Sequence, residues 1–383
     1  MTAFAIKGWC PSAFRPMLSG DGLVVRLRPR GGRLSAEQAV GIAELAQRCG
    51  NGLIDLTSRA NLQIRGVREQ SHQSLIAGLV RLGLVDDDQA MEARRNIIVA
   101  PFWADGDATH ALASELERAL AARALGLPEK FGFAIDCGRE RVLSRSPADI
   151  RIERGANGGL IVRADGAEEG RAISKADVIE VTLSLADWFV ACSGAKDGRG
   201  RMATHLAGGT KLPSAVAGDA RPVSASASQS PGIHPNGALV ALAFGQMQSE
   251  TLDFLAGLGP GLRLTPWRMI LIEDLCEMPQ HDGLVTRADD PQLRVVACTG
   301  APACPEAYVE TRKLAASLAP HLAPDTRLHV SGCAKGCAHP NASDITLVGT
   351  SDGFDLVRDG SPRDVPFQRG LTVADVRAVV GAR

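Results

Sequence analysis

The sequence predicts an α+β protein built from two copies of a two-part unit. Each copy opens with a strand, a helix and a second strand, over residues 22–67 and again over residues 237–274. The second parts of the copies also match in spacing, PEKFGFAIDC with PDTRLHVSGC and DIRIERGANGGLIVRADG with DITLVGTSDGFDLVRDG. Repetition of whole structural units indicates an internal duplication, in which neighbouring units bury their apolar faces against each other. We therefore expect a pseudo-twofold molecule with its ligand between the copies.

The first part of the first copy is expected over residues 1–90. GLVVRLRPRGG and NGLIDLTSRANLQIRGV are strand-like and flank the helical segment SAEQAVGIAELAQRCG. Ser35 suits the start of this helix and Gly50 suits its end. The second strand alternates apolar and polar residues imperfectly, so one of its faces can pack while the other addresses an anion.

The remaining parts follow in order along the chain. Residues 91–202 contain the strand segment ARRNIIVAPF, a helix in ATHALASELERALAARALG, two strands joined by a glycine-rich turn and a closing helix in KADVIEVTLSLADWFVAC. Residues 203–236 are rich in Ala, Gly, Ser and Pro without periodicity, which predicts a linker or mobile loop. The second copy then divides into residues 237–290 and 291–383.

Charge and hydropathy exclude several classes of protein. The chain has 383 residues, with 42 basic and 43 acidic side chains, so its net charge gives no electrostatic case for nucleic acid or a membrane surface. Its N-terminus lacks a signal-peptide pattern, and no apolar run approaches the roughly 20 residues of a membrane span. We expect a cytoplasmic protein that binds neither nucleic acid nor membrane.

Four of the nine cysteines form two close pairs, Cys298-x5-Cys304 and Cys333-x3-Cys337. An iron–sulfur cube needs four thiolates from different sides, and two short loops separated by a helical spacer can supply them. The motif therefore predicts a 4Fe-4S cluster. A structural zinc site, which usually prefers tighter loops, and unrelated buried thiols are the alternatives. Cys137 of the first copy aligns in spacing with Cys333 but lacks partners, so we interpret it as a buried small side chain.

The order of the cysteine pairs resembles the cluster motif of the sirohaem-dependent sulfite and nitrite reductases and of the related precorrin-3B synthases. This resemblance implies an internally duplicated nitrite/sulfite reductase-like fold. Residues 1–90 and 237–290 would be ferredoxin-like half-domains. Residues 91–202 and 291–383 would be the two sirohaem-type α/β domains, of which the second alone keeps a cluster.

Three basic residues stand where this superfamily surrounds its sirohaem and substrate anion: Arg59 in LTSRANLQIRG, Arg95 in RRNIIV and Lys130 in LPEKF. Arginine offers a fixed fork to a carboxylate or oxyanion, whereas lysine offers a mobile point charge. In the reductases the last motif continues Lys-Phe-Lys, and the second lysine helps to donate protons. Here that position is Gly132, which argues against a six-electron reduction that needs repeated proton delivery.

The opening CPSAFRPMLSGDG, the restart LRLTPWR and the tail HVSGCAKGC resemble the precorrin-3B synthases, and this resemblance spans nearly the whole chain. It implies an O2-dependent monooxygenase of cobalamin biosynthesis, which hydroxylates precorrin-3A at C20 and closes a γ-lactone. Arg15, Arg59, Arg95 and Lys130 would then pair with the carboxylates of this tetrapyrrole.

The same resemblance implies a mononuclear non-haem iron in addition to the cluster, with electrons from NADH or a reductase as an external donor. Such an iron would need histidines and a carboxylate, but the eight histidines form no motif that assigns one. No GxGxxG or GxxxxGK nucleotide-binding loop follows a strand, which favours an external donor. Two alternatives stay open: a sirohaem-dependent sulfite or nitrite reductase, and a non-catalytic tetrapyrrole-binding iron–sulfur protein.

Overall fold

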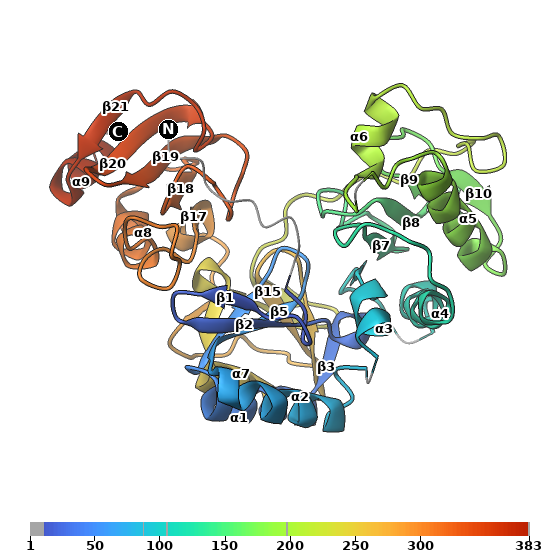
Figure 1. Ribbon diagram of the computed structural model, residues 1–383, viewed down its shortest axis with the longest axis horizontal. Coiled ribbons are helices and arrows are strands. Elements are labelled where there is room, and N and C mark those ends of the chain that lie inside the picture. Colours follow the sequence, from blue (N-terminus) through green and yellow to red (C-terminus); the bar gives the residue numbers. More distant parts are fainter. Residues whose placement is uncertain (1–10, 87, 105, 197, 382–383) are drawn as a thin grey trace.

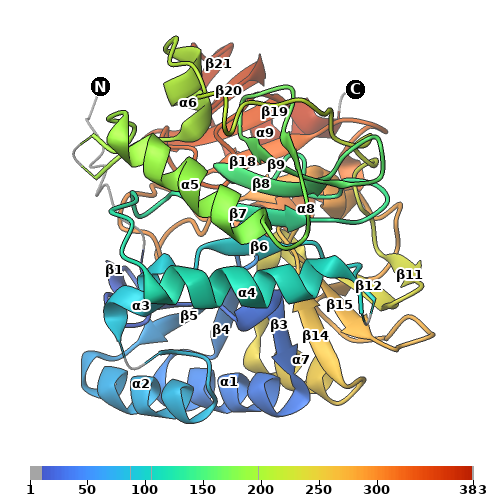
Figure 2. The ribbon, with the colours of Figure 1, turned by 90° about the vertical axis from the view of Figure 1, so that its right-hand side faces the viewer.

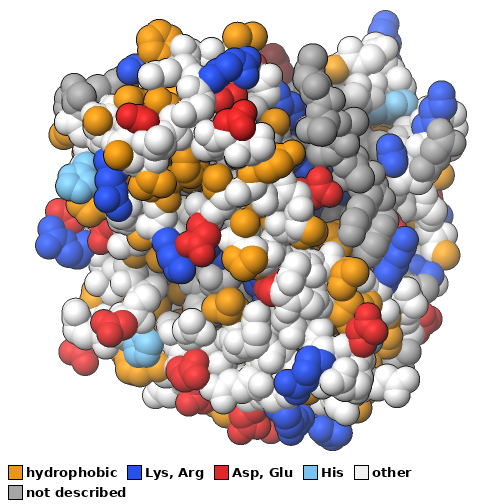
Figure 3. Space-filling model, turned by 60° about the vertical axis from the view of Figure 1, so that its left-hand side comes forward, with side chains coloured by type: hydrophobic (Ala, Val, Ile, Leu, Met, Phe, Trp, Pro, Cys, Tyr) orange, Lys and Arg blue, Asp and Glu red, His pale blue; other side chains and the backbone are white. Residues whose placement is uncertain are grey.

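The computed structural model describes residues 11–86, 88–104, 106–196 and 198–381. These residues form four sheets, two in a shared lower layer and two in separate upper lobes (Figure 1). The predicted α+β class and internal duplication are confirmed, because each copy contributes one sheet to the lower layer and one to an upper lobe. Over the face shown in Figure 3, basic and acidic side chains are interspersed, as the near-neutral net charge leads one to expect.

The lower layer is built from two sheets that exchange a strand. The first has the order β1-β2-β5-β4-β13, and the second β11-β12-β15-β14-β3, with β16 beside β12. Strand β3 of the first copy therefore completes the sheet of the second copy, and β13 of the second copy completes the sheet of the first. The strand bounds are β1 Met17–Ser19, β2 Gly22–Leu27, β3 Arg33–Ser35, β4 Leu53–Leu56, β5 Leu62–Val67, β11 Gly232–His234, β12 Gly237–Leu242, β13 Gln246–Gln248, β14 Gly261–Leu264, β15 Met269–Glu273 and β16 Leu284–Val285.

Helices α1 (Ala36–Cys49), α2 (His72–Arg81) and α7 (Ser249–Ala256) lie below the lower layer (Figure 1). The predicted start of α1 is present as a capping box, in which the Ser35 hydroxyl accepts from the Gln38 amide and the Gln38 side chain accepts from the Ser35 amide. The largest apolar core joins both copies, with Ile42 of α1 and Leu255 of α7 both fully buried in it. The lower layer is therefore one packed unit.

The upper lobes have matching topologies. The first has the order β10-β9-β8-β7-β6 and the second β17-β18-β19-β20-β21, each with parallel and antiparallel pairs. Helices α4 and α5 cover the outward face of the first lobe (Figure 2). The bounds are α3 Gln89–Arg94, β6 Ile97–Val99, α4 Ala108–Ala122, β7 Phe133–Asp136, β8 Ile150–Arg154, β9 Leu160–Ala164, β10 Arg171–Ile173, α5 Val178–Ala191, β17 Val295–Ala297, α8 Arg312–Leu318, β18 Leu328–Ser331, β19 Ser343–Thr350, β20 Gly353–Gly360, β21 Gln368–Leu371 and α9 Val373–Gly381.

Two hydrogen bonds define how the lobes correspond residue by residue. Directly before β7, the amide of Gly132 donates to the carboxylate of Asp149 at 2.9 Å. Directly before β18, the amide of Arg327 donates to Asp344 at 2.7 Å. In each lobe the aspartate directly precedes the residue that pairs in parallel with the first residue of the strand after the amide, Ile150 with Phe133 and Ile345 with Leu328. Gly132 and Arg327 are therefore equivalent positions.

This register corrects the sequence alignment of Cys137. Counting five residues on from each equivalent position places Cys137 opposite Gly332, whereas spacing alone predicted Cys333. The cause is a one-residue difference in the loop before the strand, which spacing cannot detect. Burial raises the pKa of the Cys137 thiol to about 12, and its Sγ lies 3.9 Å from the carbonyl of Ile152. It is a buried small side chain, as interpreted.

The segment 203–236 has more regular structure than its composition predicted. It overlaps helix α6 (Met202–Ala207) and contains β11, and between them it follows the edge of the first upper lobe. The backbone pairs there are Ala220 with Gly170, Pro222 with Gly155 and Ala225 with Arg141. Pairing with an existing sheet orders a segment that has no apolar periodicity of its own. Within the described residues, none of the helices is both long and apolar enough for a membrane span.

Candidate functional site

The two cysteine pairs meet at the ends of the parallel strands of the second upper lobe. Cys298 directly follows β17, and Cys333 follows β18 after one glycine. The amide of that glycine, Gly332, donates to the Sγ of Cys298 at 3.1 Å. Burial raises the pKa of the Cys337 thiol, and the charges of the other three cysteines raise it further. Cys337 therefore lies close enough to the other three thiols to interact with them electrostatically.

The backbone around these thiols suits a bulky group. Gly300 and Gly336 have φ of 71° and 65°, a region that other residues rarely adopt. A Cβ on Gly332 would lie 2.6 Å from the Cβ of Ala307, so only glycine lets the two loops approach. Among the described residues, no three His, Cys, Asp or Glu side chains are close enough to share one metal ion. The 4Fe-4S cluster therefore stays the prediction of the cysteine motif, with zinc as its alternative.

Arg268 adds a buried positive charge beside the cysteines, and sequence reasoning did not assign it. Its Nη2 donates to the carbonyl of Ala338 at 3.3 Å, next to Cys337. Burial lowers the pKa of its guanidinium, as does nearby Arg312, while Cys298 is close enough to raise it. The backbone of Arg268 has φ of 62°, which turns the side chain toward the cysteine loop. Such a conformation leaves no pattern in a single sequence.

Three of the four predicted substrate residues lie together. Nη2 of Arg59 donates to the carbonyl of Lys130 at 3.2 Å, and the Lys130 side chain is exposed. Nη1 of Arg15 pairs at 3.1 Å with the carboxylate of Glu129, which is the residue before Lys130. The short turn before β7 therefore contacts both Arg59 and Arg15, and the binding of a substrate carboxylate by Arg15, Arg59 and Lys130 stays a prediction.

The fourth predicted residue, Arg95, does not join them. Its side chain is buried, its Nε pairs with Asp86 at 2.9 Å, and its terminal nitrogens donate to the carbonyls of Arg28 and Leu84. Burial lowers the pKa of this guanidinium. Because these contacts occupy the guanidinium group, the expectation that Arg95 binds substrate is corrected. Its side chain instead holds the backbone at Arg28 and Leu84 in place.

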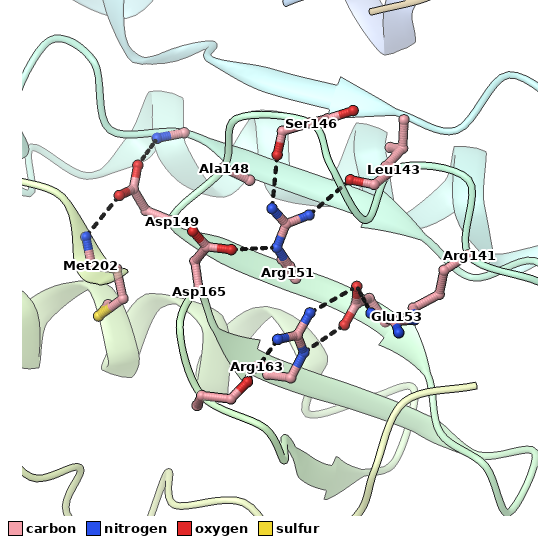
Figure 4. A network of polar contacts seen from close by, with 12 residues as sticks. Arg141, Leu143, Ser146, Ala148, Asp149, Arg151, Glu153, Arg163, Asp165 and Met202 are labelled. Atoms are coloured by element: carbon pink, nitrogen blue, oxygen red, sulfur yellow. Dashed lines mark hydrogen bonds and ion pairs between the residues drawn. The ribbon is translucent and has the colours of Figure 1, made fainter. Parts of the chain in front are cut away.

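A polar network fixes the turn that carries the basic residues (Figure 4). Asp149 accepts from the Gly132 amide through one oxygen and from the amide of Met202 through the other, at 2.9 and 2.8 Å. On the same sheet, Arg151 pairs with Asp165 at 2.7 Å and donates to two carbonyls of the loop after β7. These contacts tie the turn before β7 and the loop after it to the neighbouring strand β8.

One segment links the basic turn to the cysteine loop. Arg15 contacts Glu129 of the first upper lobe, and four residues on, the Ser19 hydroxyl donates to the carbonyl of Ala303 at 2.5 Å. The amide of Gly20 donates to the same carbonyl at 2.9 Å. Strand β1 lies in the lower layer (Figure 1). The basic residues and the cysteines therefore border the same side of the molecule.

Comparison with known proteins agrees with this architecture. Residues 15–82 match the family described as nitrite/sulfite reductase ferredoxin-like half domain. The chain is 30% identical to a precorrin-3B synthase of Sinorhizobium sp, in an alignment that covers 94% of this chain and 84% of the relative. It is 27% identical to a ferredoxin–nitrite reductase of Synechococcus elongatus, over 89% of this chain and 78% of the relative. The solved structure of the NirA protein of Mycobacterium tuberculosis superimposes with a TM-score of 0.61 at 18% identity, and covers 94% of this chain and 79% of its own.

Proposed function

Because the chain belongs to the precorrin-3B synthase family, within the sirohaem-type nitrite/sulfite reductase superfamily, we propose that it is an O2-dependent monooxygenase acting on precorrin-3A. One oxygen atom enters C20 as a hydroxyl group, and an acetate of ring A closes a γ-lactone. The second oxygen atom leaves as water, which requires two electrons and two protons. The main support for this proposal is the similarity to a precorrin-3B synthase over 94% of the chain.

The basic turn supports a polycarboxylate substrate. Arg15, Arg59 and Lys130 present cationic donors from two separate segments and a turn, which can engage carboxylates at several points of one macrocycle. Each charge-assisted hydrogen bond contributes about 1.5–3 kcal/mol when shielded from water. Arg95 acts indirectly, by fixing the chain that leads into β6.

Gly132 supports oxygenation over the reduction of a small anion. A Cβ at this position would lie 2.8 Å from Nδ2 of Asn96 and 3.2 Å from Nη1 of Arg59. A lysine there would have to displace these groups, so the turn is packed around the glycine. The site then lacks the second proton donor that repeated reduction of nitrite or sulfite needs.

The cysteines suit the electron supply of the reaction. Bound by Cys298, Cys304, Cys333 and Cys337, a 4Fe-4S cluster supplies one-electron transfer. The Gly332 amide and the Arg268 guanidinium place positive charge near Cys298, which would stabilise the more negative, reduced state of a bound cluster. NADH, through an external reductase, is the proposed electron source. In the part of the chain that the structure describes, no three His, Cys, Asp or Glu side chains are grouped as ligands of a mononuclear iron.

The test uses anaerobically purified protein, precorrin-3A, a reductant and isotopically labelled O2. Mass spectrometry should show one labelled oxygen atom in the product. Arg59→Gln should raise the KM for precorrin-3A by about 10- to 100-fold, since it removes a charge-assisted contact. Arg287→Gln, at an exposed arginine paired with Asp289, should leave the KM unchanged.

Two outcomes would overturn the proposal. Unchanged precorrin-3A in the presence of a fully assembled cluster would point to a tetrapyrrole-binding protein without this activity. Sirohaem absorption bands, together with reductant-driven consumption of nitrite or sulfite, would make the protein a reductase.

A further inference from the structure

A second group of basic side chains lines a cavity between the loop after β7 and the second upper lobe. It has a volume of about 340 Å³ and is enclosed by the loop after β7, the turn before β15 and the starts of β17 and β18. Its charged lining residues are Arg145, Arg294 and Arg327. It adjoins a cavity of about 320 Å³ that shares Trp267 with it and extends to Phe244. This volume falls in the range of small-molecule sites.

The duplication relates this cavity to the basic turn of the first copy. Arg327 is equivalent to Gly132, as the aspartate contacts before β7 and β18 define. Trp267 is equivalent to Arg59, because each donates its amide to the hydroxyl of the threonine two residues earlier, at 3.3 Å. The second copy has therefore formed its own cavity from the same backbone, with different side chains.

Arg294 enters the cavity at the position of Asn96. The register shows this, since Ile97 pairs with the first residue of β7 and Val295 pairs with the first residue of β18. In the first copy, the side-chain amide of Asn96 donates to the carbonyl of Phe131 at 2.7 Å. Arg294 has no such bond, and its Nε is buried without a hydrogen-bond partner among the described residues. A buried cationic donor without an acceptor is costly, so this group favours an anionic ligand.

The three arginines form no salt bridge with any other described residue, and the described lining includes no Asp or Glu. They come from three separate elements, so their charges surround the cavity. Leu293, Val296 and Met269 add an apolar wall beside the indole of Trp267. Guanidinium forks around an aromatic and apolar wall match a flat molecule that carries several carboxylates.

The surrounding backbone is anchored, as a binding site requires. The buried guanidinium of Arg151 donates to the carbonyls of Leu143 and Ser146 at 2.9 and 2.7 Å, on either side of Arg145 (Figure 4). Asp344 likewise holds the amide of Arg327. Both arginines therefore project from constrained backbone.

We propose that this cavity is a second binding site of the protein, for a flat polycarboxylate of the tetrapyrrole-acid type. The site is distinct from the surface formed by Arg15, Arg59 and Lys130 and does not rest on the proposed oxygenation. Its ligand contacts are the guanidiniums of Arg145, Arg294 and Arg327, with Trp267 against the plane of the molecule.

The experiment counts binding equivalents on the full, cluster-containing chain with uroporphyrin as the tetrapyrrole probe and benzene-1,3,5-tricarboxylate as the small planar probe. Wild-type protein should bind two equivalents of uroporphyrin. The double change Arg294→Asn and Arg327→Gly, which installs the residues of the first copy, should weaken one equivalent by about 100-fold or more. Arg59→Gln should weaken the other, and Arg287→Gln should weaken neither.

Arg145→Gln, at an exposed side chain, provides a second variant that does not depend on how the double variant folds, and it should weaken the same equivalent by about 10-fold. If the tricarboxylate competes for this equivalent alone, the site recognises planar polycarboxylates in general; if only uroporphyrin binds, it selects the macrocycle. Uroporphyrin binding in which no equivalent is weakened by the changes at Arg145, Arg294 and Arg327 would overturn the proposal, whatever the number of equivalents. Wild-type protein that binds this equivalent but does not oxygenate precorrin-3A would refute only the proposed function.

Discussion

Asp136 is a buried carboxyl whose ionisation weakens the fold. One oxygen accepts from the Leu143 amide at 2.7 Å, while the other has no partner among the described residues. Burial raises its pKa from 3.8 to about 6, and the charge of Glu153 acts in the same direction. Because the folded pKa is the higher one, the folded state binds more protons, and stability is lost as pH rises from about 4 through 6.

Asp136→Asn should therefore stabilise the protein at pH 8 by up to about 3 kcal/mol, since it keeps an acceptor for Leu143 and removes the charge. The gain should shrink toward zero as pH falls to about 4. Urea unfolding at several pH values measures this, with Asp253→Asn on the exposed face of α7 as the control. A gain that does not change with pH would show that the carboxyl is already neutral or solvated in the folded protein.

The nine cysteines allow a matched test of the cluster residues. Cys298→Ser and Cys304→Ser should each reduce bound iron and acid-labile sulfide from about four of each per chain to a small fraction, because a cube needs all four thiolates. The exposed Cys192→Ser and the buried Cys137→Ala should retain full cluster content. Zinc in place of iron, with no sulfide, would contradict the cluster assignment, and so would retention of the cluster in the Cys298 and Cys304 variants.

The sequence was informative about individual residues only where a motif reported a local arrangement. Arg59 and Lys130 were predicted from their motifs, and the structure brings them together. Arg95 was predicted from its motif too, but its contacts are with Asp86 and with the carbonyls of Arg28 and Leu84, which the motif does not report. Arg268 stands at a backbone position with positive φ, and Arg294 lines a cavity formed by several elements. Residue spacing in the sequence reports neither feature.

At the scale of elements, local signals were reliable and pairing was not. The capping residue of α1 and strand β2 followed from residue type and periodicity, whereas the segment 51–67, predicted as one strand, forms the antiparallel pair β4 and β5. The exchange of β3 and β13 could not be predicted, because each is a three-residue strand whose partners lie about 200 residues away in the chain. Tertiary contacts alone decide which sheet such a short strand joins.

An ion triad supports this exchange. Glu273 of β15 lies between Arg33 of β3, at 2.6 Å, and Arg263 of β14, also at 2.6 Å. Burial alone would raise the pKa of Glu273, but hydrogen bonds from the two arginines lower it. The carboxylate is therefore ionised, and it couples the exchanged strand of one copy to the sheet of the other.

Glu273→Gln should destabilise the protein by about 2 kcal/mol. This is less than the 3–5 kcal/mol of a fully enclosed pair, because the Arg33 side chain is 31% exposed. Denaturant unfolding would measure the loss, with the exposed Glu277→Gln as the control. Equal stability of the Glu273 variant and wild type would mean that backbone pairing alone holds β3.

On the scale of the whole molecule, the duplication was readable from the sequence, while the difference between the two sides was not. Equivalent backbone positions carry Gly132 on one side and Arg327 on the other, and Arg59 on one side and Trp267 on the other. The first side gathers its basic residues beside the cysteines, and the second encloses a cavity of arginines. Divergence of duplicated copies therefore gives one fold two chemically different sides.

The strand exchange also makes the two copies a single folding unit. The loop around residues 208–215 is exposed and lies between the copies, so a protease site inserted there can be cut in the folded protein. Because β3 and β13 each pair with the other copy, and because Ile42 and Leu255 share one core, the two fragments should stay together in gel filtration after cutting.

Each fragment expressed alone should lack one strand of its lower sheet and expose that core, and should therefore aggregate or give a molten circular dichroism signal. Co-expression should restore the complex, because each fragment carries the strand that the other lacks. A fragment that is monomeric and cooperatively folded on its own would show instead that the exchange follows from the folding of independent copies.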